Sequence, residues 1–164
     1  MNAIFTRSSV RSFEDKPVER EKIELILKAA MSAPTAVNQR PWEFFVVTNR
    51  EKLEKLSKVS PYAGMVAKAP VAIVICYHRD CRLPEFAHID CSLASENIWL
   101  EFEELGLGGV MLGVAPYDDR IKLAGEIIDL PENLVAFTII PFGYPKSKHE
   151  QKDRFESDRV HWIE

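Results

Sequence analysis

The sequence has few of the features that mark secreted, membrane or nucleic-acid-binding proteins. Its 164 residues include only three cysteines, an odd number that cannot form a complete disulfide framework. The longest apolar run, residues 69–77, is far too short to cross a bilayer, and the N-terminus lacks the apolar stretch of a secretory signal. The formal net charge of -4 argues against a nucleic-acid surface, which needs concentrated basic charge. We therefore expect a cytoplasmic protein with no membrane or nucleic-acid partner.

The spacing of apolar residues predicts helices that alternate with buried strands. Residues 19–32 carry apolar side chains at helical spacing, and Pro34 follows them. This alternation predicts a single domain over residues 1–164 with an α+β architecture, as a three-layer α/β sandwich. Further helices are expected at residues 84–105 and 118–128 and after a cap at Asn49, and strands at residues 43–48, 71–77, 108–112 and 135–142.

The longest expected helix, residues 84–105, spreads apolar side chains over more than one face. A helix with so wide an apolar band is usually buried centrally or packed at a subunit interface. Gly106 is well placed to follow it, because the residue after a helix often needs a positive φ. The polar tail after Gly143 ends in an apolar segment with Trp162, so we expect that tail to dock onto another surface.

Two arginines lie four residues apart near the N-terminus, with two hydroxyl side chains between them. Arg7, Ser8, Ser9 and Arg11 suit an anion such as a phosphoester. Arginine supplies forked donors, and serine can complete the hydrogen bonding of the remaining oxygens. A solvated N-terminal turn is the alternative, and for this motif alone it is the simpler interpretation.

A rigid polar loop precedes the first expected strand. Pro34 and Pro41 restrict its backbone, and Thr35, Asn38 and Gln39 lie between them. An amide offers donors and an acceptor, which match a ligand edge that alternates C=O and N–H groups. A structural turn satisfied by its own side chains is the alternative. The rigidity of the loop and its place before a core strand favour ligand binding.

Two further segments are weaker indications of a ligand site. The glycine-rich residues 106–113 are not a dinucleotide-binding fingerprint, because Met111 replaces the last glycine of G-x-G-x-x-G and the segment follows a helix. These glycines instead allow the backbone to approach a flat ligand closely. Lys152 and Arg154 form a basic pair in the tail that could reach a phosphate, although such charges are usually solvated.

Residue types that bind metals gather between residues 76 and 91, but their spacing matches no common zinc pattern. Cys76 lies inside an expected core strand, where cysteine commonly behaves as a small apolar residue. We therefore expect no metal site, and we assign His88 and Asp90 to a subunit interface without a catalytic role. The full set is Cys76, His78, Cys81, His88, Asp90 and Cys91.

Taken in order, these segments resemble the nitroreductase family of FMN-dependent oxidoreductases. The resemblance covers nearly the whole chain: an R-x-S-x-R start, the loop A-P-T-x-x-N-x-x-P-W, the G-L-G segment, a G-Y-P turn at residues 143–145 and a basic tail ending in V-H-W. The loop bracketed by prolines is the most specific of these motifs. The chain departs from the family in being short, which reduces or removes a helical excursion on the substrate side, and in placing Ser8 where a second arginine is common.

The resemblance implies a homodimer that binds FMN at its interface, built on a mostly antiparallel sheet flanked by helices, with the long helix and tail exchanged between subunits. Arg7 would bind the phosphate, Arg11 would lie near the N1/O2 edge of the ring, and Asn38 would reach the flavin from the partner subunit. Backbone groups of Leu112 and Gly113 would meet the N5/O4 edge. The cofactor-binding residues implied are Arg7, Ser8, Ser9, Arg11, Pro34, Thr35, Asn38, Gln39, Leu112, Gly113, Lys152 and Arg154.

The resemblance also implies a ping-pong oxidoreductase reaction. A hydride passes from NADH or NADPH to flavin N5, and then to a nitroaromatic, a quinone or a similar small-molecule acceptor. Protons can come from solvent, so no catalytic side chain is predicted. The alternatives are a non-enzymatic FMN-binding or redox-sensing module, and a flavin-destroying or dehalogenating relative on the same fold.

Overall fold

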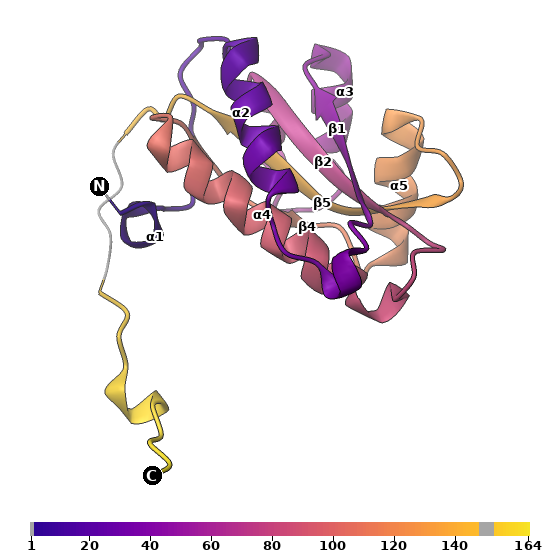
Figure 1. Cartoon of the computed structure of the whole chain (residues 1–164). Coiled ribbons are helices and arrows are strands. Elements are labelled where there is room, and N and C mark those ends of the chain that lie inside the picture. Colours follow the sequence, from indigo (N-terminus) through magenta and orange to yellow (C-terminus); the bar gives the residue numbers. More distant parts are fainter. Residues whose placement is uncertain (1, 148–152) are drawn as a thin grey trace.

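A five-stranded sheet forms the centre of the computed structural model, which describes residues 2–147 and 153–164 (Figure 1). Neighbouring strands pair in the order β1-β2-β5-β3, β4 also pairs with β5, and all these pairings are antiparallel. The strands are β1 (Trp42–Val47), β2 (Val71–His78), β3 (Gly108–Gly109), β4 (Leu112–Gly113) and β5 (Leu134–Gly143).

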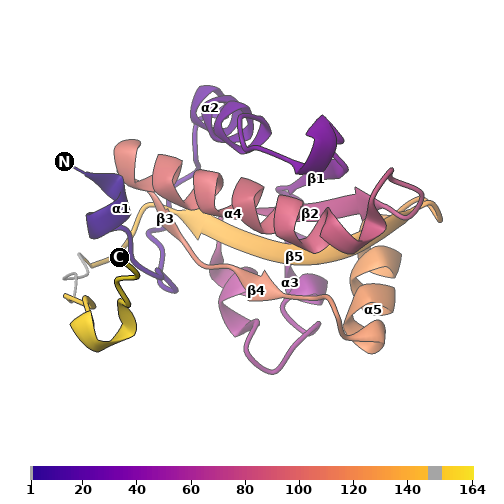
Figure 2. The same cartoon turned by 60° about the horizontal axis from the view of Figure 1, so that its bottom comes forward.

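Helices cover both faces of the sheet and create three layers (Figure 2). Helices α2 and α4 pack on one face, and α3 and α5 pack on the other. The helices are α1 (Ala3–Thr6), α2 (Arg20–Met31), α3 (Arg50–Leu56), α4 (Ala87–Glu104) and α5 (Asp118–Ile128), with 3-10 turns at Ala36–Asn38, Gly64–Lys68, Pro84–Phe86 and Ser157–Arg159.

The central strands β2 and β5 are mostly apolar, with His78 and Thr138 as exceptions, and helices cover both of their faces. Ile73 and Ile75 of β2 pack with α2 and α4, whereas Val74 and Cys76 pack with α3 and α5. Every residue of β5 is buried. A fully buried isoleucine contributes about 1.5–3 kcal/mol relative to an exposed one. The buried apolar residues of these two strands therefore supply much of the free energy that holds the layers together.

The structure confirms the α+β architecture, the antiparallel sheet and the main helices expected from the sequence. It confirms Gly106, with a φ of 68°, as the residue that follows the C-cap Leu105 of α4. The helix expected from residue 84 is wrong at its N-terminal end. Phe86 N donates to Leu83 O at 3.1 Å, so Pro84–Phe86 forms a separate 3-10 turn before α4 begins at Ala87.

The single strand expected at residues 108–112 is also wrong, because the segment forms two short strands. Val110 N donates to Pro141 O at 3.3 Å between β3 and β4. Proline has no N–H to return a hydrogen bond, so the ladder along this edge of β5 is interrupted at Pro141.

The two ends of the chain lie outside the three layers. Helix α1 follows the N-terminus, and residues 153–164 extend away from the sheet and its helices (Figure 1). All of residues 153–164 are exposed, including Trp162 at 84%. Within the described residues, their hydrogen bonds and ion pairs are confined to this segment. No helix in the described part of the chain is long and apolar enough to span a membrane.

Candidate functional site

The N-terminal basic segment is fixed against β3 and α4. Gly109 O accepts hydrogen bonds from Val10 N at 2.9 Å and from Trp99 Nε1 at 3.0 Å, and Ser9 forms a bridge with Gly109. A Cβ at Gly108 would lie 2.4 Å from Val10 Cγ2, so this close approach requires glycine. The glycine-rich segment thus positions the residues of the R-x-S-x-R motif.

Arg7 lies in this segment with part of its guanidinium unsatisfied. Its Cζ lies 4.2 Å from the centroid of the Trp99 ring, and its Nε lies 3.6 Å from Glu96 Oε1. Arg7 Nη1 is buried and has no hydrogen-bond partner among the described residues. A buried charged donor without an acceptor is costly, and an anion placed there would remove this cost. By contrast, Arg11 is exposed, and within the described parts of the chain it donates only to Ser9 O, at 3.4 Å.

The loop before β1 has a strained backbone. Val37, Asn38 and Arg40 have φ values of 46°, 55° and 46°, in the left-handed region that non-glycine residues rarely adopt. Each such residue costs on the order of 1–3 kcal/mol, so the surroundings must impose the conformation. Within the loop, Thr35 Oγ1 accepts from Arg40 N at 3.2 Å. Asn38 is exposed, as a ligand contact requires.

A buried carboxylate from α4 holds this loop. Asp90 accepts hydrogen bonds from Ala36 N at 2.9 Å and from Gln39 Nε2 at 2.7 Å. Gln39 also donates to Leu83 O at 3.2 Å and accepts from Leu83 N at 2.8 Å. The structure thus uses the amide of Gln39 within the chain. Asp90 is 1% exposed, so the expectation that it lies at a subunit interface is wrong.

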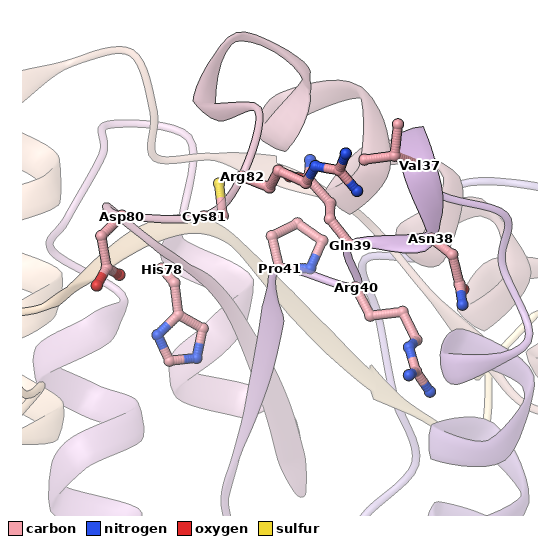
Figure 3. Close-up of a pocket in the computed structure, with 9 residues that line it drawn as sticks. All are labelled: Val37, Asn38, Gln39, Arg40, Pro41, His78, Asp80, Cys81 and Arg82. Atoms are coloured by element: carbon pink, nitrogen blue, oxygen red, sulfur yellow. The ribbon is translucent and has the colours of Figure 1, made fainter.

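Figure 3 shows a pocket between this loop and the segment that follows β2. Arg82 extends along the loop toward Val37, and Asp80 lies at the opposite end, while Asn38 and Arg40 project on the side away from Asp80. Among the described residues, the guanidinium groups of Arg40 and Arg82 have no hydrogen bond or ion pair. The pocket adjoins the exposed side of the Asn38 loop, because residues 37–41 form part of its lining. Its lining residues are Val37, Asn38, Gln39, Arg40, Pro41, His78, Asp80, Cys81 and Arg82.

The residues predicted to meet the flavin N5/O4 edge form β4. The carbonyl oxygen of Leu112 accepts from Thr138 Oγ1 at 2.8 Å, and that of Gly113 accepts from Arg120 Nη1 at 3.1 Å. Gly113 is exposed and Leu112 is partly buried. These two hydrogen bonds connect β4 to β5 and to α5, and so hold the backbone that is predicted to meet the flavin edge.

The predicted site residues fall into separate groups within one chain. Arg7 contacts Glu96 and Trp99 of α4, whereas the Asn38 loop is bound to Asp90 of the same helix. Asp90 and Trp99 are nine residues apart on α4, which corresponds to a rise of about 14 Å along the helix axis and separates the two groups. Arg154 is exposed and lies in the tail segment 153–164, and the predicted contact at Lys152 lies outside the described residues.

The cysteines are free and mostly buried. Burial raises the pKa of the Cys91 thiol to about 12, helped by the neighbouring Asp90 carboxylate. Burial likewise raises the pKa of Cys76 and, to a lesser degree, that of the partly exposed Cys81. All three are therefore neutral thiols near pH 7, which makes them poor nucleophiles. Among the described residues no three potential metal ligands come together.

Sequence reasoning assigned Asp90 to a subunit interface and did not connect Trp99 with the site, although both residues shape it. Asp90 could have been noticed because it shares the inner face of α4 with the buried Ala87 and Ala94, where a charged residue needs an internal partner. Nothing local indicated that Trp99 would stack on Arg7, which is distant in sequence.

The overall fold is that of nitroreductase-type oxidoreductases. A solved structure from Clostridium acetobutylicum, provisionally named NADH oxidase, superposes with a TM-score of 0.94 at 43% identity and covers 97% of both chains. An FMN-dependent nitroreductase from Clostridium difficile superposes with a TM-score of 0.92 at 30% identity, covering 99% of this chain and 98% of the other.

Sequence similarity identifies the family. Residues 4–60 and 57–144 match the Nitroreductase family. A protein of Methanothermobacter thermautotrophicus, provisionally named NADH dehydrogenase/NAD(P)H nitroreductase, is 46% identical over 162 residues, which cover 98% of this chain and 85% of the relative. The chain therefore belongs to the nitroreductase family and is an oxidoreductase of that type.

Proposed function

We propose that this chain forms a homodimer that binds FMN and transfers hydride from NADH or NADPH to a nitroaromatic, a quinone or a similar acceptor. Residues 1–164 would form one FMN-binding domain. The three free cysteines suit a reducing compartment such as the cytoplasm. The observation that carries the proposal is the buried Nη1 of Arg7, which has no hydrogen-bond partner in residues 2–147 and 153–164.

The residues around Arg7 fit the phosphate of FMN. Arg7 offers an unused donor, and Ser8, Ser9 and Arg11 add hydroxyl, backbone and guanidinium donors close by in sequence. A guanidinium matches the geometry of phosphate oxygens, and charge-assisted hydrogen bonds are stronger than neutral ones. We also place Lys152 and Arg154 of the tail at the phosphate, as the family resemblance implies.

The exposed apolar surface supports a dimer. Ile89 and Leu93 on α4 are 54% and 40% exposed, and Ile4 and Phe5 on α1 are 65% and 63% exposed. Contacts between α1 and α4 bring these elements together, and exposed apolar patches commonly mark protein–protein interfaces. We place these side chains in the subunit interface, together with the exposed apolar end of the tail.

Bound FMN would supply the redox chemistry by accepting a hydride from NAD(P)H and giving it to the acceptor. The protein would position the ring and adjust its charge. Arg11 would favour negative charge at the N1/O2 edge, and backbone groups of Leu112 and Gly113 would meet the N5/O4 edge. The partner subunit would contribute the loop residues that surround the flavin, which are Pro34, Thr35, Asn38 and Gln39. Protons would come from solvent.

The test is an anaerobic titration of the purified protein with NADH and NADPH while the visible spectrum is recorded. We expect a yellow protein whose flavin absorbance is bleached by the nucleotide and restored by an acceptor. A colourless protein that does not take up added FMN would refute the proposal. A yellow protein that neither nucleotide bleaches would favour a non-enzymatic FMN module, and product analysis would reveal flavin breakdown or dehalogenation.

A further inference from the structure

Asp90 is a buried carboxylate without a cationic partner. Its side chain lies on the inner face of α4, is 1% exposed, and forms no ion pair with any described residue. Asp and Glu are almost never fully buried unless they are paired. Both Asp90 oxygens instead accept hydrogen bonds from the loop before β1, at Ala36 N and Gln39 Nε2.

Gln39 connects this carboxylate to the segment that follows β2. Its Nε2 donates to both Asp90 and Leu83 O, and its Oε1 accepts from Leu83 N. These three bonds fix the orientation of the amide. A flip of the amide would break both bonds to Leu83 and would place Oε1 against the Asp90 carboxylate, where two acceptors would repel. Asp90, Gln39 and Leu83 therefore form one linked network beneath the loop.

The network acts on the part of the loop with the least favourable backbone. Ala36 and Gln39, which it binds, flank the left-handed residues Val37 and Asn38. A β-branched residue such as Val37 does not adopt this conformation without external support. Hydrogen bonds to a charged acceptor are about twice as strong as neutral ones and can provide that support.

We infer that Asp90 is a positioning residue, which holds the Asn38 loop in the shape that binds FMN. This role rests on the proposed function. A loop held in its binding conformation before the ligand arrives loses less conformational entropy on binding. The Asp90 network would thus increase FMN affinity without any contact between its carboxylate and the cofactor.

The variant Asp90→Asn tests this role. In either orientation, the Asn amide would place an N–H group against a donor, at Ala36 N or at Gln39 Nε2. We expect FMN to bind about tenfold more weakly, measured by quenching of flavin fluorescence. At saturating FMN we also expect a changed visible circular dichroism spectrum, because Asn38 would no longer be held against the ring.

Ser95→Ala is the matched control. Ser95 lies on the same helix, is also 1% exposed, and donates within the helix to Cys91 O at 2.7 Å. Its removal should lower the melting temperature of the FMN-free protein but leave FMN affinity and the dichroism unchanged. The inference is overturned if Asp90→Asn and Ser95→Ala have the same FMN affinity and spectrum.

Gln39→Met tests the same network from the loop. It should reproduce the loss of FMN affinity. Combined with Asp90→Asn it should cause little further loss, because both changes break the same hydrogen bond between Asp90 and Gln39. Full additivity would contradict the network. If Asp90→Asn does not fold, Gln39→Met alone still tests it, and no effect of Gln39→Met would contradict the network. If the wild-type protein itself does not bind FMN, the proposed function fails, and with it this role.

Discussion

At the scale of single residues, Arg7 is the clearest sign of a ligand site. Its ring contact with Trp99 and its long ion pair with Glu96 hold the side chain, but they leave Nη1 without an acceptor in the part of the chain that the structure describes. A side chain held in place with an unused buried donor suits an anion that arrives from outside. The sequence motif suggested an anion site, and the family resemblance assigned the phosphate to Arg7. The structure adds that Trp99 and Glu96 hold the Arg7 side chain, whereas Arg11 is exposed.

Arg7→Met should weaken the binding of FMN but not of riboflavin, which lacks the phosphate. Methionine keeps apolar contact with Trp99 while removing the charge. Hydrogen bonds to charged groups contribute about 1.5–3 kcal/mol, so we expect FMN affinity to fall at least about tenfold. Fluorescence titration with each flavin measures this. Arg20→Met, at an exposed arginine paired with Glu24, is the control. Equal losses for both flavins would rule out a phosphate contact.

Val37→Asn should stabilise the protein. Val37 is exposed but has a φ of 46°, a conformation that asparagine tolerates far better than a β-branched residue. We expect the free energy of unfolding to rise by about 1 kcal/mol, measured by denaturant titration. Val46→Asn, at a similarly exposed position in β1, should instead destabilise. A loss of stability in Val37→Asn would show that the loop is not strained.

At the scale of elements, α4 connects the whole site. One face packs in the core, Asp90 holds the loop before β1, Trp99 supports Arg7, and Ile89 and Leu93 remain exposed. The wide apolar band of this helix was readable from the sequence. Its division into a core face and an exposed face was not, because that depends on where α2 and β5 pack against it.

Leu93→Asp should convert the dimer into monomers. A carboxylate buried without a partner at both symmetric positions costs several kcal/mol, so the dissociation constant should rise at least about a hundredfold. Light scattering during size-exclusion chromatography measures the mass. Leu123→Asp, at an apolar residue of α5 with 38% exposure, is the control and should remain dimeric. A Leu93→Asp variant that stays dimeric would place the interface elsewhere.

The sequence predicted β2, β5, α2 and α5 well because their apolar patterns are long and regular. It misplaced the start of α4 and merged β3 with β4. These errors arise from a 3-10 turn that begins at Pro84 and from the missing N–H of Pro141, both of which act through hydrogen bonding with other residues. The same limit applies to the site, since Asp90 and Gln39 lie 51 residues apart and no local pattern joins them.

At the scale of the whole molecule, the proposed site requires two chains. Within one chain, Arg7 and Asn38 are associated with different parts of α4, and the apolar residues of α1 and the tail are exposed. If one subunit contributes Arg7 and the other Asn38, each dimer has two shared sites. A mixed dimer can then distinguish a shared site from one formed within a single chain.

The most direct measurement is the FMN stoichiometry of a mixed dimer of Arg7→Met and Asn38→Asp chains, purified by two affinity tags. Asp keeps the left-handed backbone accessible while placing a negative charge where the amide would contact the ring. Each homodimer should bind FMN weakly at both sites. If the site is shared, the mixed dimer has one intact site and should bind one FMN with wild-type affinity. If both residues act within one chain, each site carries one defect, and the absence of any wild-type-affinity site would contradict the shared cofactor site.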